Sequence, residues 1–142
     1  MNPDEIIVAV SGYFDPLHVG HIECMELAKK LGHKLVVIVN NDRQAILKKG
    51  KEFMPFKERV KIIQSLGIVD DVFESIDKDG SVCKSLEALK PHIFAKGGDR
   101  NVGNIPEKEV CERFQIKIID GLGAKIQASS KLIKDSLRGG LI

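Results

Sequence analysis

His18 and His21 are the residues whose types and spacing most suggest chemistry, and Gly20 lies between them. The two histidines are three residues apart, so their side chains share a face if a helix has begun by His18. A helix start presents free backbone N–H groups and the positive end of a dipole, and it therefore attracts phosphate. Gly20 lets a bulky ligand approach the backbone closely. The cluster Gly12–His21 thus favours binding of a phosphorylated ligand.

Spacing alone leaves three other interpretations of this cluster open. His18 and His21, with Cys24, could bind a metal ion, although no further ligand is apparent and metal sites usually need one. Both histidines could be polar surface residues at a helix start. Gly12 could begin a dinucleotide-binding fingerprint, but the Gly-x-Gly-x-x-Gly pattern is missing at this point of the sequence.

The hydrophobic pattern shows which elements must position these residues. Apolar runs predict buried strands at residues 6–10, 35–39, 71–76, 93–95 and 116–119. Helical spacing and end signals predict helices at residues 19–31, 55–66, 82–89, 106–114 and 129–137. Residues 43–54 are rich in lysine and lack clean periodicity.

Strands that alternate with helices predict an α/β fold. We expect a single Rossmann-like domain over residues 1–142, with an about five-stranded parallel sheet and helices on both faces. Ligands of such sheets bind outside the carboxyl ends of the strands. The most unusual clusters all follow predicted strands, namely residues 12–21, 40–42 and 96–100.

The overall composition narrows the function classes. The chain has 22 Lys and Arg against 20 Asp and Glu, a net charge of +2, which is too small to argue for nucleic-acid binding. No apolar stretch is long enough to span a membrane, and the acidic start is unlike a secretory signal. Three scattered cysteines argue against a disulfide framework or a zinc knuckle. These features are typical of a cytoplasmic protein.

The first cluster resembles a known signature. Residues 12–21 match the Gly-x-Phe-Asp-x-x-His-x-Gly-His pattern of the cytidylyltransferase-like nucleotidyltransferases at every fixed position. That superfamily includes glycerol-3-phosphate cytidylyltransferase, pantetheine-phosphate adenylyltransferase, archaeal FAD synthetase and heptose 1-phosphate adenylyltransferase. The resemblance implies that His18 and His21 are catalytic. It also implies nucleotide-binding roles for Gly12, Tyr13, Phe14, Asp15 and Gly20, with Asp15 fixing the first loop or acting through a cation.

A second cluster, Lys96-Gly97-Gly98-Asp99, follows the short strand at 93–95. Two glycines after a strand could form a simple turn, or a backbone that a ligand can approach. The segment is similar to the Lys-Gly-Gly-Asp stretch of the heptose 1-phosphate adenylyltransferases, where it lies at the nucleotide. That similarity implies nucleotide-binding roles for these four residues and favours ATP.

A third cluster, Ala128-Ser129-Ser130, precedes the last predicted helix. Either serine could simply cap that helix. In the resembled family this position carries hydroxyl residues that hold the β- and γ-phosphates, so all three are expected to bind nucleotide. Ala128 stands where the first hydroxyl is usual, which is a departure from the family pattern.

A fourth set consists of the basic residues Lys48, Lys49, Lys51 and Arg59. Such residues often form only a solvated surface. The set resembles the basic loop of the family and the helix that follows it, in which one lysine and the arginine touch phosphates. We expect catalytic roles for Lys51 and Arg59, with Lys48 as the second choice of lysine. The expected acceptor-binding residues are Lys48, Asn41 and Asp42.

Together these features predict a nucleotidyltransferase. It would join a nucleoside triphosphate, ATP by preference, to a phosphorylated acceptor such as a sugar 1-phosphate and release pyrophosphate. Mg²⁺ would arrive with the nucleotide, since no dedicated protein cage is visible. The alternatives are a cytidylyltransferase that uses CTP and glycerol 3-phosphate or another polyol phosphate, and a non-catalytic nucleotide sensor. No membrane or nucleic-acid partner is expected, and a homodimer is possible.

Overall fold

The computed structural model describes residues 4–97 and 105–122 of the chain. Its strands are β1 (Ile7–Gly12), β2 (Lys34–Val39), β3 (Asp71–Glu74), β4 (Ile93–Gly97) and β5 (Lys117–Leu122). Its helices are α1 (Val19–Lys29), α2 (Asp42–Lys49), α3 (Phe56–Gln64), α4 (Cys83–Leu89) and α5 (Glu107–Arg113). The expected closing helix at 129–137, with Ala128, Ser129 and Ser130, lies outside the described residues, as do Gly98 and Asp99.

The five strands form one parallel sheet in the order β3-β2-β1-β4-β5. Strand β1 lies in the centre and pairs with β2 over its whole length, from Ile7 to Gly12. Its pairing with β4 covers only Val8 and Ala9. The strand order reverses at β1 and β4, and such switch points are where doubly wound sheets bind ligands. The predicted α/β fold class is confirmed.

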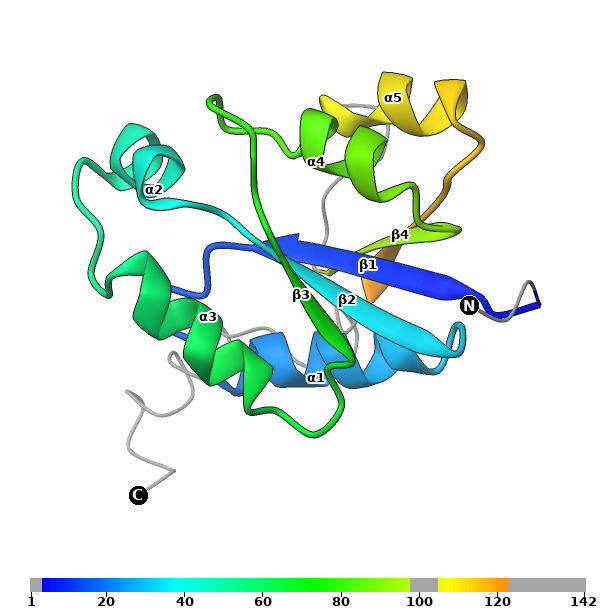
Figure 1. The fold of residues 1–142 in the computed structure, drawn as a ribbon, viewed down its shortest axis with the longest axis horizontal. Coiled ribbons are helices and arrows are strands. Elements are labelled where there is room, and N and C mark those ends of the chain that lie inside the picture. Colours follow the sequence, from blue (N-terminus) through cyan, green and yellow to red (C-terminus); the bar gives the residue numbers. More distant parts are fainter. Residues whose placement is uncertain (1–3, 98–104, 123–142) are drawn as a thin grey trace, which may run out of the picture.

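Helices cover both faces of the sheet, as Figure 1 shows. Helices α1 and α3 lie on one face, and α4 and α5 lie on the other. Alternation along β1 supplies both cores, because Val8 and Val10 pack with Met25 of α1 while Ala9 packs with Leu86 of α4. Burial of this apolar surface on two faces stabilises the central strand and fixes the position of the loop that follows it.

Helix α2 occupies part of the segment 43–54 for which the sequence predicts no element. It is defined at its ends rather than by an apolar face. Asn41 and Gln44 form a capping box, in which the Asn41 side chain accepts from the Gln44 N–H at 2.9 Å. Gly50 ends the helix in the left-handed region, at φ +82°. Within the described residues, no helix is both long and apolar enough to cross a membrane.

Candidate active site

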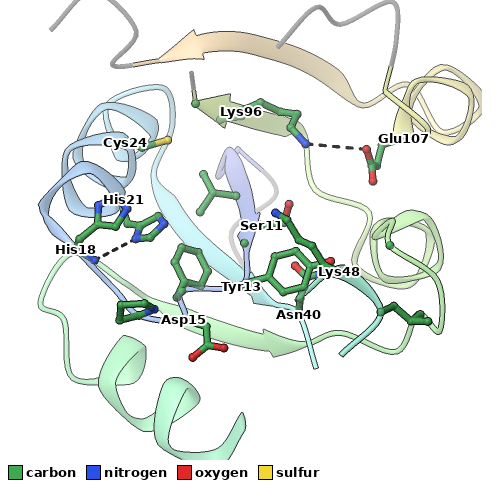
Figure 2. A pocket seen from close by; sticks show the side chains of 18 residues that line it. Ser11, Tyr13, Asp15, His18, His21, Cys24, Asn40, Lys48, Lys96 and Glu107 are labelled. Carbon is green, nitrogen blue, oxygen red and sulfur yellow. Dashed lines mark hydrogen bonds and ion pairs between the residues drawn. The ribbon is translucent and has the colours of Figure 1, made fainter. Parts of the chain in front are cut away.

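A cavity of about 810 Å³ opens at the carboxyl ends of the central strands. Figure 2 shows the side chains that surround it. It is lined by Val10, Ser11, Gly12, Tyr13, Phe14, Asp15, Pro16, His18, His21, Cys24, Asn40, Leu47, Lys48, Gly80, Ala95, Lys96, Gly97 and Glu107. The first cluster and the described part of the second therefore meet at one site, as the strand-end rule predicts.

His18 and His21 hold each other at the start of α1. His18 is the N-cap residue, and its Nδ1 accepts from the Gly20 N–H at 3.1 Å. The His18 N–H in turn donates to Nδ1 of His21, also at 3.1 Å. The two rings stack with their centroids 3.8 Å apart. Two imidazoles thus replace the usual Ser and Glu of a capping box.

This arrangement determines which ring nitrogen can donate to a ligand. Because Nδ1 of each histidine accepts a backbone N–H, the proton of each neutral ring lies on Nε2. Burial, and to a smaller extent the neighbouring His18, lowers the pKa of His21 to about 4. His21 is therefore neutral near pH 7. It can offer one uncharged N–H donor to a ligand in the cavity.

Phe14 packs against His21 and helps to hold its ring in place. Its ring is buried and meets the His21 ring edge-on, with centroids 5.1 Å apart and planes at 76°. Gly12 makes room for it, because a Cβ at Gly12 would lie 2.8 Å from the Phe14 ring. Gly12 and Phe14, two fixed positions of the resembled pattern, therefore shape the site through packing of the aromatic ring. Both residues also line the cavity.

Asp15 fixes the loop that precedes α3. Its carboxylate accepts from the N–H of Phe53 at 2.8 Å and from the N–H of Met54 at 2.5 Å. The peptide bond between Asp15 and Pro16 is cis. Of the two roles that the sequence left open for Asp15, the structure supports loop fixation, since both carboxylate oxygens serve backbone donors.

The family comparison bears directly on this geometry. The sequence model of the family described as Cytidylyltransferase-like matches residues 9–128. The chain belongs to the cytidylyltransferase-like family. The match spans β1, the histidine loop and β4, which are the elements that build the cavity. The expectation of a nucleotidyltransferase is confirmed at this level.

Individual relatives agree with this assignment. The chain is 33% identical over 135 residues to the bifunctional protein HldE of Desulfatibacillum aliphaticivorans, an alignment that covers 94% of this chain and 27% of that protein. It is 36% identical over 115 residues to the FAD synthase of Pyrococcus abyssi, covering 80% and 76%. The chain thus spans about a quarter of the length of the bifunctional relative.

A solved structure shares the fold. The lipopolysaccharide core biosynthesis protein from Thermoplasma volcanium superposes with a TM-score of 0.70 at 30% identity, covering 82% of this chain and 95% of that chain. The cytidylyltransferase-like chain is therefore similar to this protein in architecture as well as in sequence.

Arg59 of this cytidylyltransferase-like chain is not among the described residues that line the cavity, and its expected contact with phosphate stays a prediction. Its side chain is 0% exposed. The guanidinium donates to the carbonyls of Tyr13 at 2.8 Å, Asn40 at 2.6 Å and Met54 at 3.0 Å, and to the Asp42 carboxylate at 2.8 Å. Arg59 therefore joins the ends of β1 and β2 to α2 and the following loop. It is a positioning residue.

Asn41 and Asp42 also have structural partners, and their expected place beside the acceptor stays a prediction. The Asn41 amide donates to the carbonyls of Ser75 at 3.1 Å and Asp77 at 3.0 Å, besides capping α2. Asp42 pairs with Arg59 and accepts from the Phe56 N–H at 3.3 Å. Neither belongs to the described cavity lining, in which the neighbouring Asn40 takes their place.

The basic segment contributes Lys48 to the cavity. Its Nζ lies 4.5 Å from the centre of the Tyr13 ring, a cation–π distance. Lys51, the first choice from the sequence, is exposed in the bend after Gly50 and is not among the described lining residues. The placement favours Lys48 as the lysine that meets a substrate.

The sequence did not predict a substrate-site role for several lining residues of this cytidylyltransferase-like site. Cys24, considered from the sequence only as a metal ligand, follows His21 by three positions on α1, so its helical spacing could have indicated a place in the cavity lining. Burial raises the pKa of its thiol, which stays neutral. Gly97 packs against Cys24, because a Cβ at Gly97 would lie 2.9 Å from its Sγ. No pattern in the sequence marks Glu107 as a site residue, because only the folded chain brings the start of α5 to the cavity.

A metal site in the protein itself gains no support from the described residues. Among them, no three His, Cys, Asp or Glu side chains gather where they could hold a metal ion. The interpretation of His18, His21 and Cys24 as metal ligands is further weakened because both Nδ1 atoms serve backbone donors.

Proposed function

We propose that the chain transfers the nucleotidyl group of a nucleoside triphosphate, ATP by preference, to a phosphorylated small acceptor such as a sugar 1-phosphate, with release of pyrophosphate. The observation that carries this proposal is the histidine pair at the start of α1. Its hydrogen bonds leave the Nε2–H groups of His18 and His21 as donors at a cavity large enough for a nucleotide.

The reaction requires little acid–base chemistry from the protein. The second pKa of a phosphate monoester is about 6, so the acceptor's attacking oxygen is already anionic near pH 7. What the site must supply is in-line placement at the α-phosphorus and relief of growing negative charge. His18 and His21 donate to the triphosphate, with His21 nearest the α-phosphate. Donors fixed before substrate binds lose little free energy to reorganisation during the reaction.

Lys48 supplies positive charge, which the neutral His21 imidazole lacks. It lies at the cavity on α2, where its ammonium can neutralise the acceptor phosphate or the leaving pyrophosphate. Mg²⁺ would enter bound to the triphosphate, whose oxygens supply most of its ligands. Asp15 is not proposed as a metal ligand, because it holds Phe53 and Met54.

The preference for ATP rests on the Lys96-Gly97-Gly98-Asp99 resemblance and on the similarity to HldE proteins. The FAD synthase similarity keeps FMN as a second acceptor to test. A cytidylyltransferase with glycerol 3-phosphate is the remaining enzymatic alternative, and a non-catalytic sensor is the alternative outside the enzymes. A homodimer, a cytoplasmic location and the absence of nucleic-acid partners stay predictions.

A pyrophosphate-release assay tests the proposal. ATP, CTP, GTP and UTP are each combined with sugar 1-phosphates, polyol phosphates and FMN. His21→Asn is the sharpest variant, because its side-chain oxygen can still accept the His18 N–H while the Nε2–H donor is lost. We expect it to lower kcat about 10²–10³-fold.

His92→Asn is the matched control for this variant. Nδ1 of His92 accepts the Ile7 N–H at 3.0 Å, the same kind of bond at the opposite end of β1. We expect its turnover to equal that of the unmodified chain. Nucleotide binding without pyrophosphate on every acceptor would favour the sensor instead, and full turnover of folded His21→Asn would reject the histidine assignment.

A further inference from the structure

The wall of the cavity that faces the histidines includes part of the connection between β3 and α4. Figure 2 shows His18 and His21 on one side of the cavity and Lys48 of α2 on the other. Gly80 also lines the cavity, and it belongs to residues 75–82, which join β3 to α4. The position of this glycine relative to α2 therefore shapes the space that a substrate can fill.

Gln44 of α2 holds the connection on both sides of Gly80. Its side chain is fully buried, and its Nε2 donates to the carbonyl of Asp79 at 2.7 Å and to that of Ser81 at 2.8 Å. Its Oε1 accepts the Asn41 N–H at 3.0 Å. Both amide hydrogens and the oxygen of Gln44 are thus engaged, and the chain on either side of Gly80 is tied to α2.

The connection is also tied to itself and to α4. The Asp79 carboxylate accepts the Ser81 N–H at 3.0 Å and the Ser81 hydroxyl at 2.7 Å, which closes a turn around Gly80. The Asp77 carboxylate accepts the Ser85 N–H at 2.9 Å and the Ser85 hydroxyl at 2.6 Å. A segment with this many hydrogen bonds forms a fixed wall against which the size of a ligand matters.

Gly80 leaves open space at this wall, and the fold does not require a glycine there. A Cβ added at Gly80 would meet no heavy atom within 4 Å, and its backbone lies outside the left-handed region. Gly12 and Gly97 differ, because a Cβ there would lie 2.8 Å and 2.9 Å from its nearest neighbour. Packing and backbone conformation therefore explain those two glycines but not Gly80.

The space at Gly80 lies on the acceptor side of the cavity in the proposed function. Gln44 and Lys48 are four residues apart on α2, so they share a face of that helix. Gln44 holds the connection, and Lys48 lines the cavity. The histidines opposite serve the triphosphate in that proposal, which leaves the wall at α2 to the acceptor.

We infer that Gly80 is a specificity-determining residue, because its lack of a side chain sets the size of acceptor that the cavity admits. This inference rests on the proposed function. It assigns to Gly80 a role in substrate selection rather than in folding. The competing interpretations are that Gly80 only completes a surface turn, or that the nucleotide fills the space beside it.

A series of side chains at position 80 tests the inference. Gly80→Ala and Gly80→Leu are assayed for pyrophosphate release with glycerol 3-phosphate, a hexose 1-phosphate and FMN, which increase in size. One methylene of misfit changes kcat/KM about 10- to 200-fold, so we expect Gly80→Leu to lower it at least about 10-fold for the largest acceptor that the unmodified chain uses. The loss is smaller in Gly80→Ala and for smaller acceptors, and the nucleotide KM stays unchanged.

Gly67→Leu is the matched control. Gly67 is also exposed, a Cβ added there also meets nothing within 4 Å, and it is not among the described lining residues. We expect its kinetics to equal those of the unmodified chain with every substrate. Thermal unfolding of each variant confirms that it is folded.

The remaining outcomes separate the inference from the proposed function. Unchanged acceptor kinetics in folded Gly80→Leu, or an equal loss for small and large acceptors, rejects the inference and leaves nucleotidyl transfer intact. A raised nucleotide KM in Gly80→Leu places the nucleotide at this wall and also rejects the inference alone. Pyrophosphate release from no pair of substrates by the unmodified chain rejects the proposed function, and the inference with it.

Discussion

The main-chain N–H of His18 donates to Nδ1 of His21, so the first histidine of the pair orients the second. The ring of His21 is also held by stacking on His18 and by the edge of Phe14. These contacts are made within the protein itself, and they leave the Nε2–H of His21 as its donor. A residue fixed in this way has consequences that can be measured.

The first prediction concerns pH. The pKa of His21 is about 4 in the folded chain and about 6.5 when unfolded. Between these values the unfolded chain binds a proton that the folded chain does not, so the contribution of His21 to folding is full above pH 6.5 and is lost as pH falls to 4. The free energy of unfolding, from urea titrations at several pH values, should fall less steeply with acid in His21→Asn. Parallel curves for the two proteins would contradict the lowered pKa.

The second prediction concerns Arg59. Replacement by Lys keeps the charge but removes the planar set of donors that reaches three carbonyls and Asp42. A hydrogen bond to a charged group contributes about 1.5–3 kcal/mol, so loss of at least one of these bonds should lower the unfolding free energy by about that amount or more. The exposed Arg113→Lys, on α5, should cost below about 0.5 kcal/mol. If Arg59→Lys kept full stability and lost only activity, the expected contact of Arg59 with phosphate would be supported instead.

The third prediction concerns Gly97 and Cys24. Gly97→Ala places a methyl group 2.9 Å from the Cys24 sulfur, so overpacking should cost about 1–3 kcal/mol. Cys24→Ala removes that sulfur, and the double variant should be more stable than the sum of the single effects by at least about 0.5 kcal/mol. Gly67→Ala is the control, since nothing lies within 4 Å of its added Cβ. Additive effects would show that the two residues do not press on each other in solution.

The fourth prediction concerns which lysine, Lys48 or Lys51, contacts a substrate. Lys48→Gln should raise the KM of a phosphorylated substrate about 10-fold or more, because a charge-assisted contact contributes about 1.5–3 kcal/mol. Lys51→Gln should leave the kinetics unchanged, given its exposed place after Gly50. Steady-state kinetics with each substrate varied in turn checks both. The reverse pattern would return Lys51 to the site as the sequence first suggested.

The sequence predicted the elements that follow hydrophobic periodicity. The helix that begins at Val19, and the central strand before it, were predictable because apolar spacing and a polar loop mark both. The histidine cluster at that junction was predictable for the same reason. Helix α2 was not, since it depends on the caps at Asn41 and Gly50 rather than on an apolar face.

The roles of Arg59 and Glu107 could not be predicted from the sequence. Arg59 is buried because four acceptors converge on it from Tyr13, Asn40, Asp42 and Met54, and only the folded chain brings them together. A lone arginine on a helix gives no sign of this. Glu107 reaches the cavity because α5 packs beside α4, where it accepts the Val82 N–H.

Three of the four acceptors that Arg59 engages are main-chain carbonyl oxygens, and every amino acid carries one. The hydrogen bonds of Arg59 therefore do not depend on which side chains occupy positions 13 and 40, although the side chains of Tyr13 and Asn40 both border the cavity. Substitutions there could retune the choice of acceptor while the scaffold beneath them stays intact. The side chains at these two positions can therefore change during evolution, and the substrate preference with them, without loss of the hydrogen bonds that hold the fold together at Arg59.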